Sequence, residues 1–140
     1  MVGREHQPHI LLVNDTQEIL DLLQELLEEE DYRVTTSLAM LNLEKITDLD
    51  PDLIVQDLFF AHGQETGWKF LELVRLSPAL AQIPLILCTA AIEVVRDEEM
   101  AARLRRLNVH VVLKPFDIHE LLQVIAQLLP GNCDEKRAMR

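Results

Sequence analysis

The sequence is poor in cysteine and in basic residues, and each shortage argues against a class of protein. Its two cysteines are Cys88, inside an apolar run, and Cys133, in a polar stretch near the end. This separation argues against a disulfide or a metal cluster, so we expect both to be free thiols. The 13 basic residues stand against 24 acidic ones, a formal net charge of -11. That charge disfavours direct binding to nucleic acid or to acidic membrane surfaces.

Long apolar runs are also missing. No stretch approaches the roughly 18 apolar residues of a membrane span, and the start, MVGREHQPH, lacks the apolar centre of a secretory signal. We therefore expect a cytoplasmic protein with neither a membrane nor a nucleic acid as its direct partner. A chain of 140 residues with 49% hydrophobic content is enough for one domain around one core.

What the sequence does contain is a fivefold alternation of short apolar runs and amphipathic stretches. Most of the runs consist largely of Val, Ile and Leu, as is typical of strands that are covered on both faces. The predicted strands are HILLV (His9 to Val13), YRVTT (Tyr32 to Thr36), LIVQ (Leu53 to Gln56), PLILCT (Pro84 to Thr89) and VHVVL (Val109 to Leu113).

Helical patterns fill the spaces between the runs. Gly67 to Leu76 and Ala91 to Leu107 are predicted helices, and Leu38 to Thr47 has the least regular pattern. The first and last helices each place an apolar stripe on one face. The stripes are Ile19, Leu22, Leu23, Leu26 and Leu27 in the first, and Ile118, Leu121, Leu122, Ile125, Leu128 and Leu129 in the last.

Five strand–helix units in series predict a doubly wound, flavodoxin-like α/β domain. It would be a five-stranded parallel sheet with helices on both faces, because parallel strands need right-handed crossovers. We expect this domain at residues 9–129, an N-terminal extension at 1–8 and a flexible C-terminal tail at 130–140.

Polar side chains stand at the ends of four predicted strands. Asn14 and Asp15 follow the first strand, Asp57 follows the third, Thr89 ends the fourth and Lys114 follows the fifth. Ligands of open α/β sheets bind beyond the carboxyl ends of the strands, where the strand order reverses. We therefore expect two carboxylates, a hydroxyl and an ammonium to meet at one rim.

This combination of groups suits the capture of a phosphoryl group. A carboxylate is a poor nucleophile toward an anionic phosphoryl donor unless a divalent cation offsets the repulsion. Mg²⁺ is typically held by one or two carboxylates with phosphate and water oxygens, and Asp15 and Asp57 supply such carboxylates. Lys114 can then stabilise the charge on the transferring oxygens.

Four motifs, ILLVND, DLIVQD, PLILCTA and LKPFD, resemble in order and separation the receiver domain of two-component response regulators. The resemblance covers about residues 9–129. It implies that Asp57 is the phosphoacceptor, that the Thr89 hydroxyl binds the phosphoryl group, and that Lys114 is its counter-ion.

The resemblance also implies a cofactor and partners. Mg²⁺ would be held by Asp15, by Asp57 and by the backbone carbonyl of Phe59, with Asn14 acting through a water molecule. The chain would be a single-domain response regulator, phosphorylated by a sensor histidine kinase or a phosphotransfer protein. It would signal by conformational change to a separate downstream protein, with a homodimer as a further possibility. It would transfer phosphate only to its own aspartate and so would not be an enzyme with turnover.

Each of these residues also has an ordinary structural explanation. Asp57 can be a turn residue, and Asp15 can cap the helix that begins near Gln17. Thr89 can be a β-branched strand residue, and Lys114 can simply be solvated. The order of all four and their common position at strand ends favour the functional interpretation.

Departures from the family pattern support a rival hypothesis. Asn14 stands where a second acid is usual in the family, which should weaken Mg²⁺ binding. The loop after Asp57 is longer than usual, and Val111 stands where the family commonly has an aromatic residue that changes its orientation. The rival is a receiver-like adaptor that works through protein contacts without phosphate. A phosphatase with an aspartyl nucleophile is disfavoured, because Phe59 stands where a second acid is usual.

Overall fold

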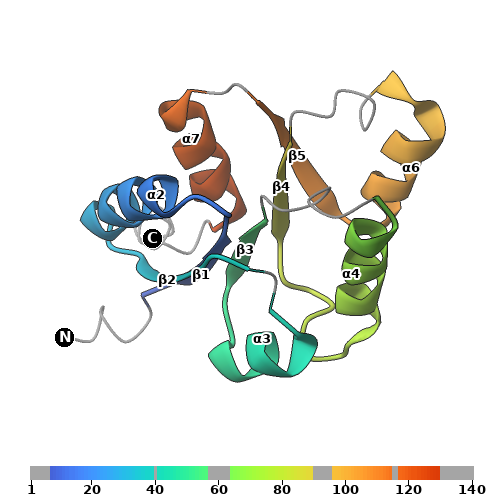
Figure 1. Ribbon diagram of the computed structural model, residues 1–140, viewed down its shortest axis with the longest axis horizontal. Coiled ribbons are helices and arrows are strands. Elements are labelled where there is room, and N and C mark those ends of the chain that lie inside the picture. Colours follow the sequence, from blue (N-terminus) through green and yellow to red (C-terminus); the bar gives the residue numbers. More distant parts are fainter. Residues whose placement is uncertain (1–6, 40, 57–63, 90–95, 115–116, 130–140) are drawn as a thin grey trace, which may run out of the picture.

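A five-stranded parallel sheet forms the centre of the computed structural model (Figure 1). The structure describes residues 7–39, 41–56, 64–89, 96–114 and 117–129. The strand order β2-β1-β3-β4-β5, with every pair parallel, confirms the predicted flavodoxin-like fold. The strands are β1 (His9–Val13), β2 (Arg33–Ser37), β3 (Leu53–Gln56), β4 (Leu85–Thr89) and β5 (Val109–Leu113).

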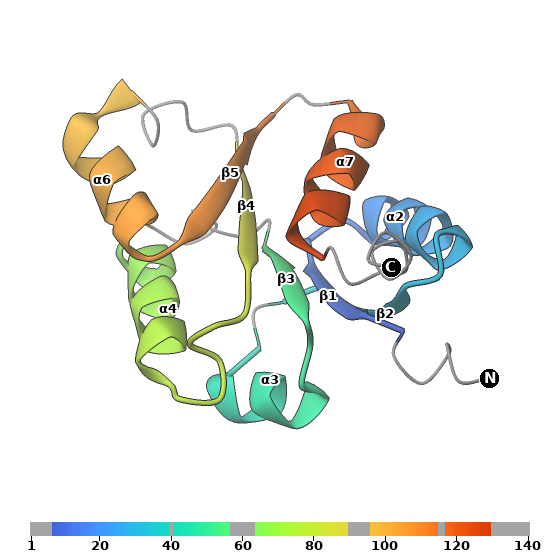
Figure 2. The same ribbon diagram turned by 180° about the vertical axis from the view of Figure 1, so that it is seen from behind.

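Helices cover both faces of the sheet (Figures 1 and 2). On one face lie α2 (Gln17–Glu29) and α7 (Ile118–Leu128). On the other lie α3 (Leu43–Leu49), α4 (Gln64–Leu76) and α6 (Glu98–Arg106). Because side chains alternate along a strand, β1, β3, β4 and β5 each contribute to two separate apolar clusters, whereas the edge strand β2 contributes only Val34, to one of them. This explains why the runs are almost wholly apolar instead of alternating with polar residues.

The buried stripe of α2 differs from the predicted one. Leu20, Leu23 and Leu27 are buried against the sheet, whereas Ile19 and Leu22 are 39% and 43% exposed. The prediction placed Ile19 and Leu22 in the buried stripe and left out Leu20, which is 1% exposed. The sheet and α7 instead cover a narrower stripe that is centred on the i, i+3, i+7 positions of Leu20.

The predicted helix from Ala91 to Leu107 is wrong as a single element. The backbone of Asp97 is extended (φ -79, ψ 118), and its carboxylate accepts hydrogen bonds from the backbone N–H groups of Glu99 and Met100. Asp97 is therefore the N-cap of a new helix that begins at Glu98. The prediction for 91–95 lies outside the described residues.

Three described helices end next to left-handed residues that are not glycine. Asp31, Asp50 and Asn108 have φ values of 72, 51 and 56, and each leads within a few residues into the next strand. Aspartate and asparagine tolerate this conformation better than other residues with a side chain. Short turns at the amino ends of β2, β3 and β5 thus form in a chain that has only four glycines.

Arg75 links two helix–strand connections through hydrogen bonds. Its guanidinium, on the last turn of α4, donates to the carbonyl oxygens of Leu107 (2.6 Å) and Asn108 (3.1 Å) at the end of α6. It also donates to three carbonyls of the α4–β4 connection, those of Leu80, Ala81 and Ile83. Burial lowers the pKa of Arg75. These contacts lie at the amino ends of β4 and β5, opposite the predicted site.

Two composition-based expectations meet the structure only in part. Cys88 is buried and forms no disulfide within the described residues, as predicted, whereas Cys133 lies outside the described residues. The predicted terminal extension falls almost wholly, and the predicted tail entirely, outside the described residues. Within the part of the chain that the structure describes, no helix is long and apolar enough to cross a membrane.

Candidate site at the carboxyl edge of the sheet

The predicted site residues belong to four strands that are neighbours in the sheet. Asp15 lies just beyond β1, Thr89 ends β4 and Lys114 follows β5, all at the carboxyl edge. The strand order reverses between β1 and β3, and Asp57, which follows β3 in sequence, lies outside the described residues. At ~4.8 Å per strand, the four strands span roughly 14 Å. The described members therefore share one edge of modest width.

Thr89 and Lys114 are held together by the backbone. The N–H of Lys114 donates to the carbonyl oxygen of Thr89 at 2.8 Å, which extends the β4–β5 ladder past the end of β5. Thr89 is only 5% exposed, whereas Lys114 is exposed. The hydroxyl-bearing residue is thus fixed within the sheet, and the ammonium-bearing residue stands at its rim.

Asp15 does not cap α2. The N-cap residue is Thr16, whose hydroxyl donates to the Asp15 carboxylate at 3.3 Å. The Asp15 side chain is exposed at the rim. Its ordinary structural explanation as a helix cap is therefore wrong, which leaves an exposed carboxylate at the end of β1.

Asn14 is buried, and its side-chain amide oxygen accepts a backbone hydrogen bond. That oxygen accepts a hydrogen bond from the backbone N–H of Thr16 at 2.8 Å, and the Asn14 N–H donates to Ser37 at 3.1 Å. An amide oxygen has two lone pairs and can accept more than one hydrogen bond, so this contact is compatible with the predicted role of Asn14 toward a metal-bound water. The first turn after β1 is thus organised by Asn14, and it leaves Asp15 free to face the rim.

A metal site would be made wholly of oxygen ligands. Among the described residues, no group of three or more His, Cys, Asp or Glu side chains is placed to hold a metal ion. The predicted ligand set also includes Asp57 and the Phe59 carbonyl, which lie outside the described residues. Carboxylate, carbonyl and water oxygens are the ligands that Mg²⁺ prefers, so the chemistry of the predicted donors fits that ion.

One polar residue beside the site was missed by the sequence analysis. Gln56, the last residue of β3, is wholly buried, and both polar atoms of its side chain lack a hydrogen-bond partner in the described structure. Val111 lies in the same row of the sheet, because Gln56 pairs with Leu87 and Leu87 pairs with Val111. The signal was present in the sequence, since the otherwise apolar run LIVQ ends in a glutamine.

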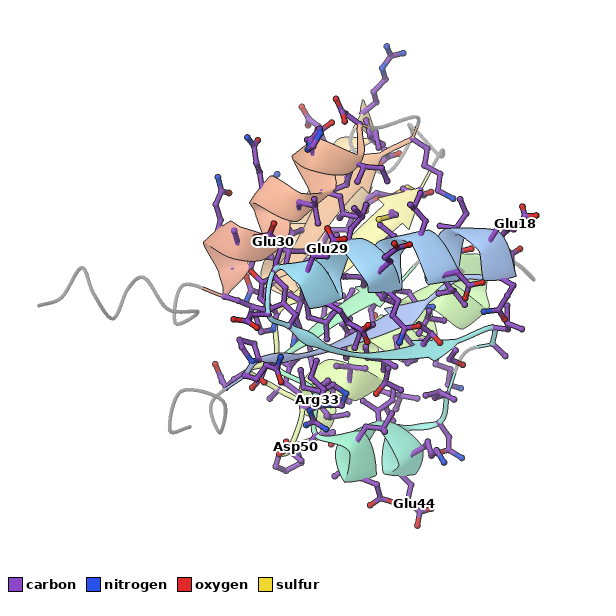
Figure 3. The ribbon with its side chains drawn as sticks, turned by 90° about the vertical axis from the view of Figure 1, so that its left-hand side faces the viewer. Glu18, Glu29, Glu30, Arg33, Glu44 and Asp50 are labelled. Atoms are coloured by element: carbon purple, nitrogen blue, oxygen red, sulfur yellow. The ribbon has the colours of Figure 1, made fainter. Side chains whose placement is uncertain are left out.

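A second buried polar residue, His9, lies at the opposite edge. Its ring nitrogens contact the Leu49 carbonyl (3.1 Å) and the Thr35 hydroxyl (2.7 Å). Burial, followed by the positive charge of Arg33, lowers the pKa of His9 below its ordinary value of 6.5. Figure 3 shows Arg33 and Asp50 at the same end of the molecule. This histidine belongs to the packing of α3 and β2, far from the carboxyl edge.

Comparisons with known proteins agree with this architecture. The family model for the response regulator receiver domain matches residues 10–126. Hybrid signal transduction histidine kinase D of Dictyostelium discoideum is 30% identical over 125 residues, which is 89% of this chain and 8% of that protein. Two-component response regulator ORR3 of Oryza sativa subsp. indica is 28% identical over 102 residues, 73% of this chain and 72% of that protein.

Solved structures show the same fold. The CheY-like receiver domain protein of Methanospirillum hungatei JF-1 matches with a TM-score of 0.73 and 23% identity, over 92% of this chain and 98% of that one. Chemotaxis protein CheY4 of Vibrio cholerae matches with a TM-score of 0.70 and 22% identity, over 88% of this chain and 99% of that one.

Proposed function

Because this chain belongs to the response regulator receiver domain family, we propose that Asp57 accepts a phosphoryl group from a phosphohistidine. Receiver domains are signalling domains that interact with histidine kinases or phosphotransfer proteins. The observation that carries the proposal is the common edge shared by Asp15, Thr89 and Lys114, each from a strand beside or near β3.

The transfer would proceed as a single exchange of bonds. A carboxylate oxygen of Asp57 forms a bond to phosphorus while the phosphorus–nitrogen bond of the donor breaks, and the donor imidazole keeps the electron pair. The Lys114 ammonium stabilises the charge spread over the phosphoryl oxygens, and the Thr89 hydroxyl donates a hydrogen bond to one of them. The product is an acyl phosphate on this chain, so one transfer leaves the domain modified instead of turning over.

Receiver domains generally bind Mg²⁺ at the phosphorylation site. In this chain Asp15, Asp57 and the Phe59 carbonyl would hold the ion, with Asn14 contacting it through water. When bound, the ion offsets the repulsion between the Asp57 carboxylate and the incoming phosphoryl group. Asparagine in place of an acid leaves the site one negative charge short, so we expect weaker Mg²⁺ binding than an Asp at position 14 would give.

Phosphorylation would signal by a conformational change that a separate downstream protein detects. A homodimer is a further proposed partner state. The matching hybrid histidine kinase is far longer than this chain, which spans 8% of its length, so the activity of that whole protein is not transferred here.

The rival function is an adaptor that does not use phosphate, and Asn14 and Val111 favour it. Titration calorimetry with beryllofluoride, which mimics a phosphoryl group on aspartate, separates the two. We expect Mg²⁺-dependent binding to the natural chain and none to Asp57→Asn. Asp48→Asn, which removes an exposed carboxylate from α3, is the matched control and should bind normally. Absence of binding to the natural chain would favour the adaptor.

A further inference from the structure

The carboxamide of Gln56 is buried beneath the carboxyl edge without a hydrogen-bond partner in the described structure. Its register neighbours are Val13 on β1 and Leu87 on β4, and both belong to the apolar cluster under α3, α4 and α6. Ile54, two residues earlier on β3, belongs to the same cluster. Alternation along the strand therefore directs the Gln56 side chain into this cluster.

A buried amide without partners raises the free energy of the state that contains it, because the amide has lost its hydrogen bonds to water. Methionine or leucine would fill this position without that cost, since the neighbours are apolar. A buried unsatisfied group needs a specific explanation in a native protein. A partner that the amide gains in another state of the same domain would supply that explanation.

Thr89 is a described polar residue close enough to serve as this partner. It lies two residues beyond Leu87 on β4, so its side chain points to the same face of the sheet as that of Gln56. A strand spacing of ~4.8 Å and a rise of ~3.3 Å per residue place the two Cα atoms roughly 8 Å apart. A glutamine side chain and one hydrogen bond of about 2.9 Å can span that gap.

We propose that Gln56 is a positioning residue that acts through Thr89, an inference that rests on the proposed function. In the phosphorylated state the Thr89 hydroxyl donates to the phosphoryl group on Asp57, and Nε2–H of Gln56 donates to Oγ1 of Thr89. A hydroxyl has one donor and two acceptor positions, so Thr89 can make this bond in addition to its others. The phosphorylated state gains the hydrogen bond that the present structure lacks, so Gln56 shifts the equilibrium toward that state.

This hydrogen bond would also connect β4 with β3. Such a connection matters in this chain because Val111 stands where the family commonly has an aromatic residue. Gln56 and Val111 lie in one row, on β3 and β5, with Leu87 between them. A polar side chain on β3 that responds to Thr89 would carry the signal to the face covered by α3, α4 and α6. No movement of Val111 is needed.

The first test compares Gln56→Met with Ile54→Val. Methionine keeps the length of the side chain but removes the amide, and Ile54→Val changes packing on the same strand and the same face. We expect Gln56→Met to bind Mg²⁺ and beryllofluoride about five- to tenfold more weakly, the loss of one net hydrogen bond. Ile54→Val should bind as the natural chain does. Equal binding by Gln56→Met would overturn the inference.

A double-mutant cycle separates a bond to Thr89 from general packing. In a Thr89→Val background, Gln56→Met should cause no further loss, because the acceptor is already absent. In a Thr89→Ser background, which keeps the hydroxyl, the loss should return. Losses that add in both backgrounds would show that Gln56 does not act through Thr89.

A third measurement does not depend on variants that fold or bind well. The side-chain NH₂ resonances of Gln56 in the ¹⁵N-labelled natural chain should move downfield when Mg²⁺ and beryllofluoride are added together. Unchanged resonances in a chain that binds beryllofluoride would overturn this inference alone. A natural chain that binds no beryllofluoride would overturn the proposed function and this inference together.

Discussion

The backbone N–H of Lys114 donates a 2.8 Å hydrogen bond to the carbonyl oxygen of Thr89. This bond involves neither side chain, so the backbone alone places the hydroxyl of one residue and the ammonium of the other on adjacent strands. Replacing the Lys114 side chain should therefore leave this backbone contact and the fold intact while removing the positive charge.

Lys114→Met should slow phosphorylation by a small phosphodonor such as acetyl phosphate by roughly 100-fold, the effect of losing one preorganised charge partner. Lys114→Arg should keep part of the rate. The measurement is the initial rate of phosphoprotein formation at saturating Mg²⁺. Lys45→Met, which removes an exposed charge from α3, is the control. A normal rate in Lys114→Met would mean that this lysine is only a solvated rim residue.

Asn14→Asp should tighten Mg²⁺ binding roughly tenfold, because a second carboxylate near the cation contributes about 1.4 kcal/mol. An aspartate can still accept the hydrogen bond that Asn14 now takes from the Thr16 N–H, so the turn should persist. Calorimetric titration with Mg²⁺ measures the change, and Asp15→Asn should move the affinity in the opposite direction. An unchanged affinity in Asn14→Asp would show that position 14 does not sense the ion.

Much of the fold followed from the sequence because three strands, β1, β3 and β4, are buried along their whole length. HILLV, LIVQ and VHVVL contain enough apolar residues to define strands, and the observed β1, β3 and β5 have the predicted bounds. The strand ends then placed Asp15, Thr89 and Lys114 at one edge. The roles of these residues in phosphoryl transfer remain predictions.

Most of what the sequence did not reveal depends on contacts between distant segments, and the helix start at Asp97 is the exception. The break at Asp97 is a local cap, but an apolar pattern from Ala91 onward obscured it. The exposure of Ile19 and Leu22 depends on how much of α2 the sheet and α7 cover. In the sequence Arg75 is an ordinary residue at a helix end. Its role depends on the folded structure, in which the carbonyl of Asn108 after α6 lies beside it.

Arg75→Met should lower the free energy of unfolding by about 2–4 kcal/mol, because five carbonyls, four of them in part-buried contacts, lose a charged donor. Arg75→Lys should recover only part of this, since an ammonium cannot reach the carbonyls of two separate connections in the same way. Urea denaturation measures both. Beryllofluoride affinity of the folded variants should be unchanged, because these contacts lie at the amino ends of β4 and β5. A loss below ~0.5 kcal/mol would contradict the structural role of Arg75.

Stability should fall as the pH drops below about 6.5, in part because of His9. Its pKa is lowered in the folded state, chiefly by burial, so between that lowered value and 6.5 the unfolded chain binds more protons. Protonation of His9 then favours the unfolded chain. This destabilising contribution of His9 is absent above pH 6.5. His9→Gln should flatten the fall in unfolding free energy between pH 7 and pH 5.

His110→Gln is the matched control for this pH dependence, because His110 is exposed on β5. It should leave the slope as it is in the natural chain. A slope that is unaffected by His9→Gln, or that is flattened equally by both variants, would contradict the assignment to His9.

The central claim is that Asp57 becomes phosphorylated, and intact-mass measurement tests it most directly. After incubation with acetyl phosphate and Mg²⁺, the natural chain should gain the mass of one phosphoryl group, and chelation of Mg²⁺ should prevent the gain. Asp57→Asn should gain nothing under the same conditions. An unmodified natural chain, or an equal gain in Asp57→Asn, would contradict the account.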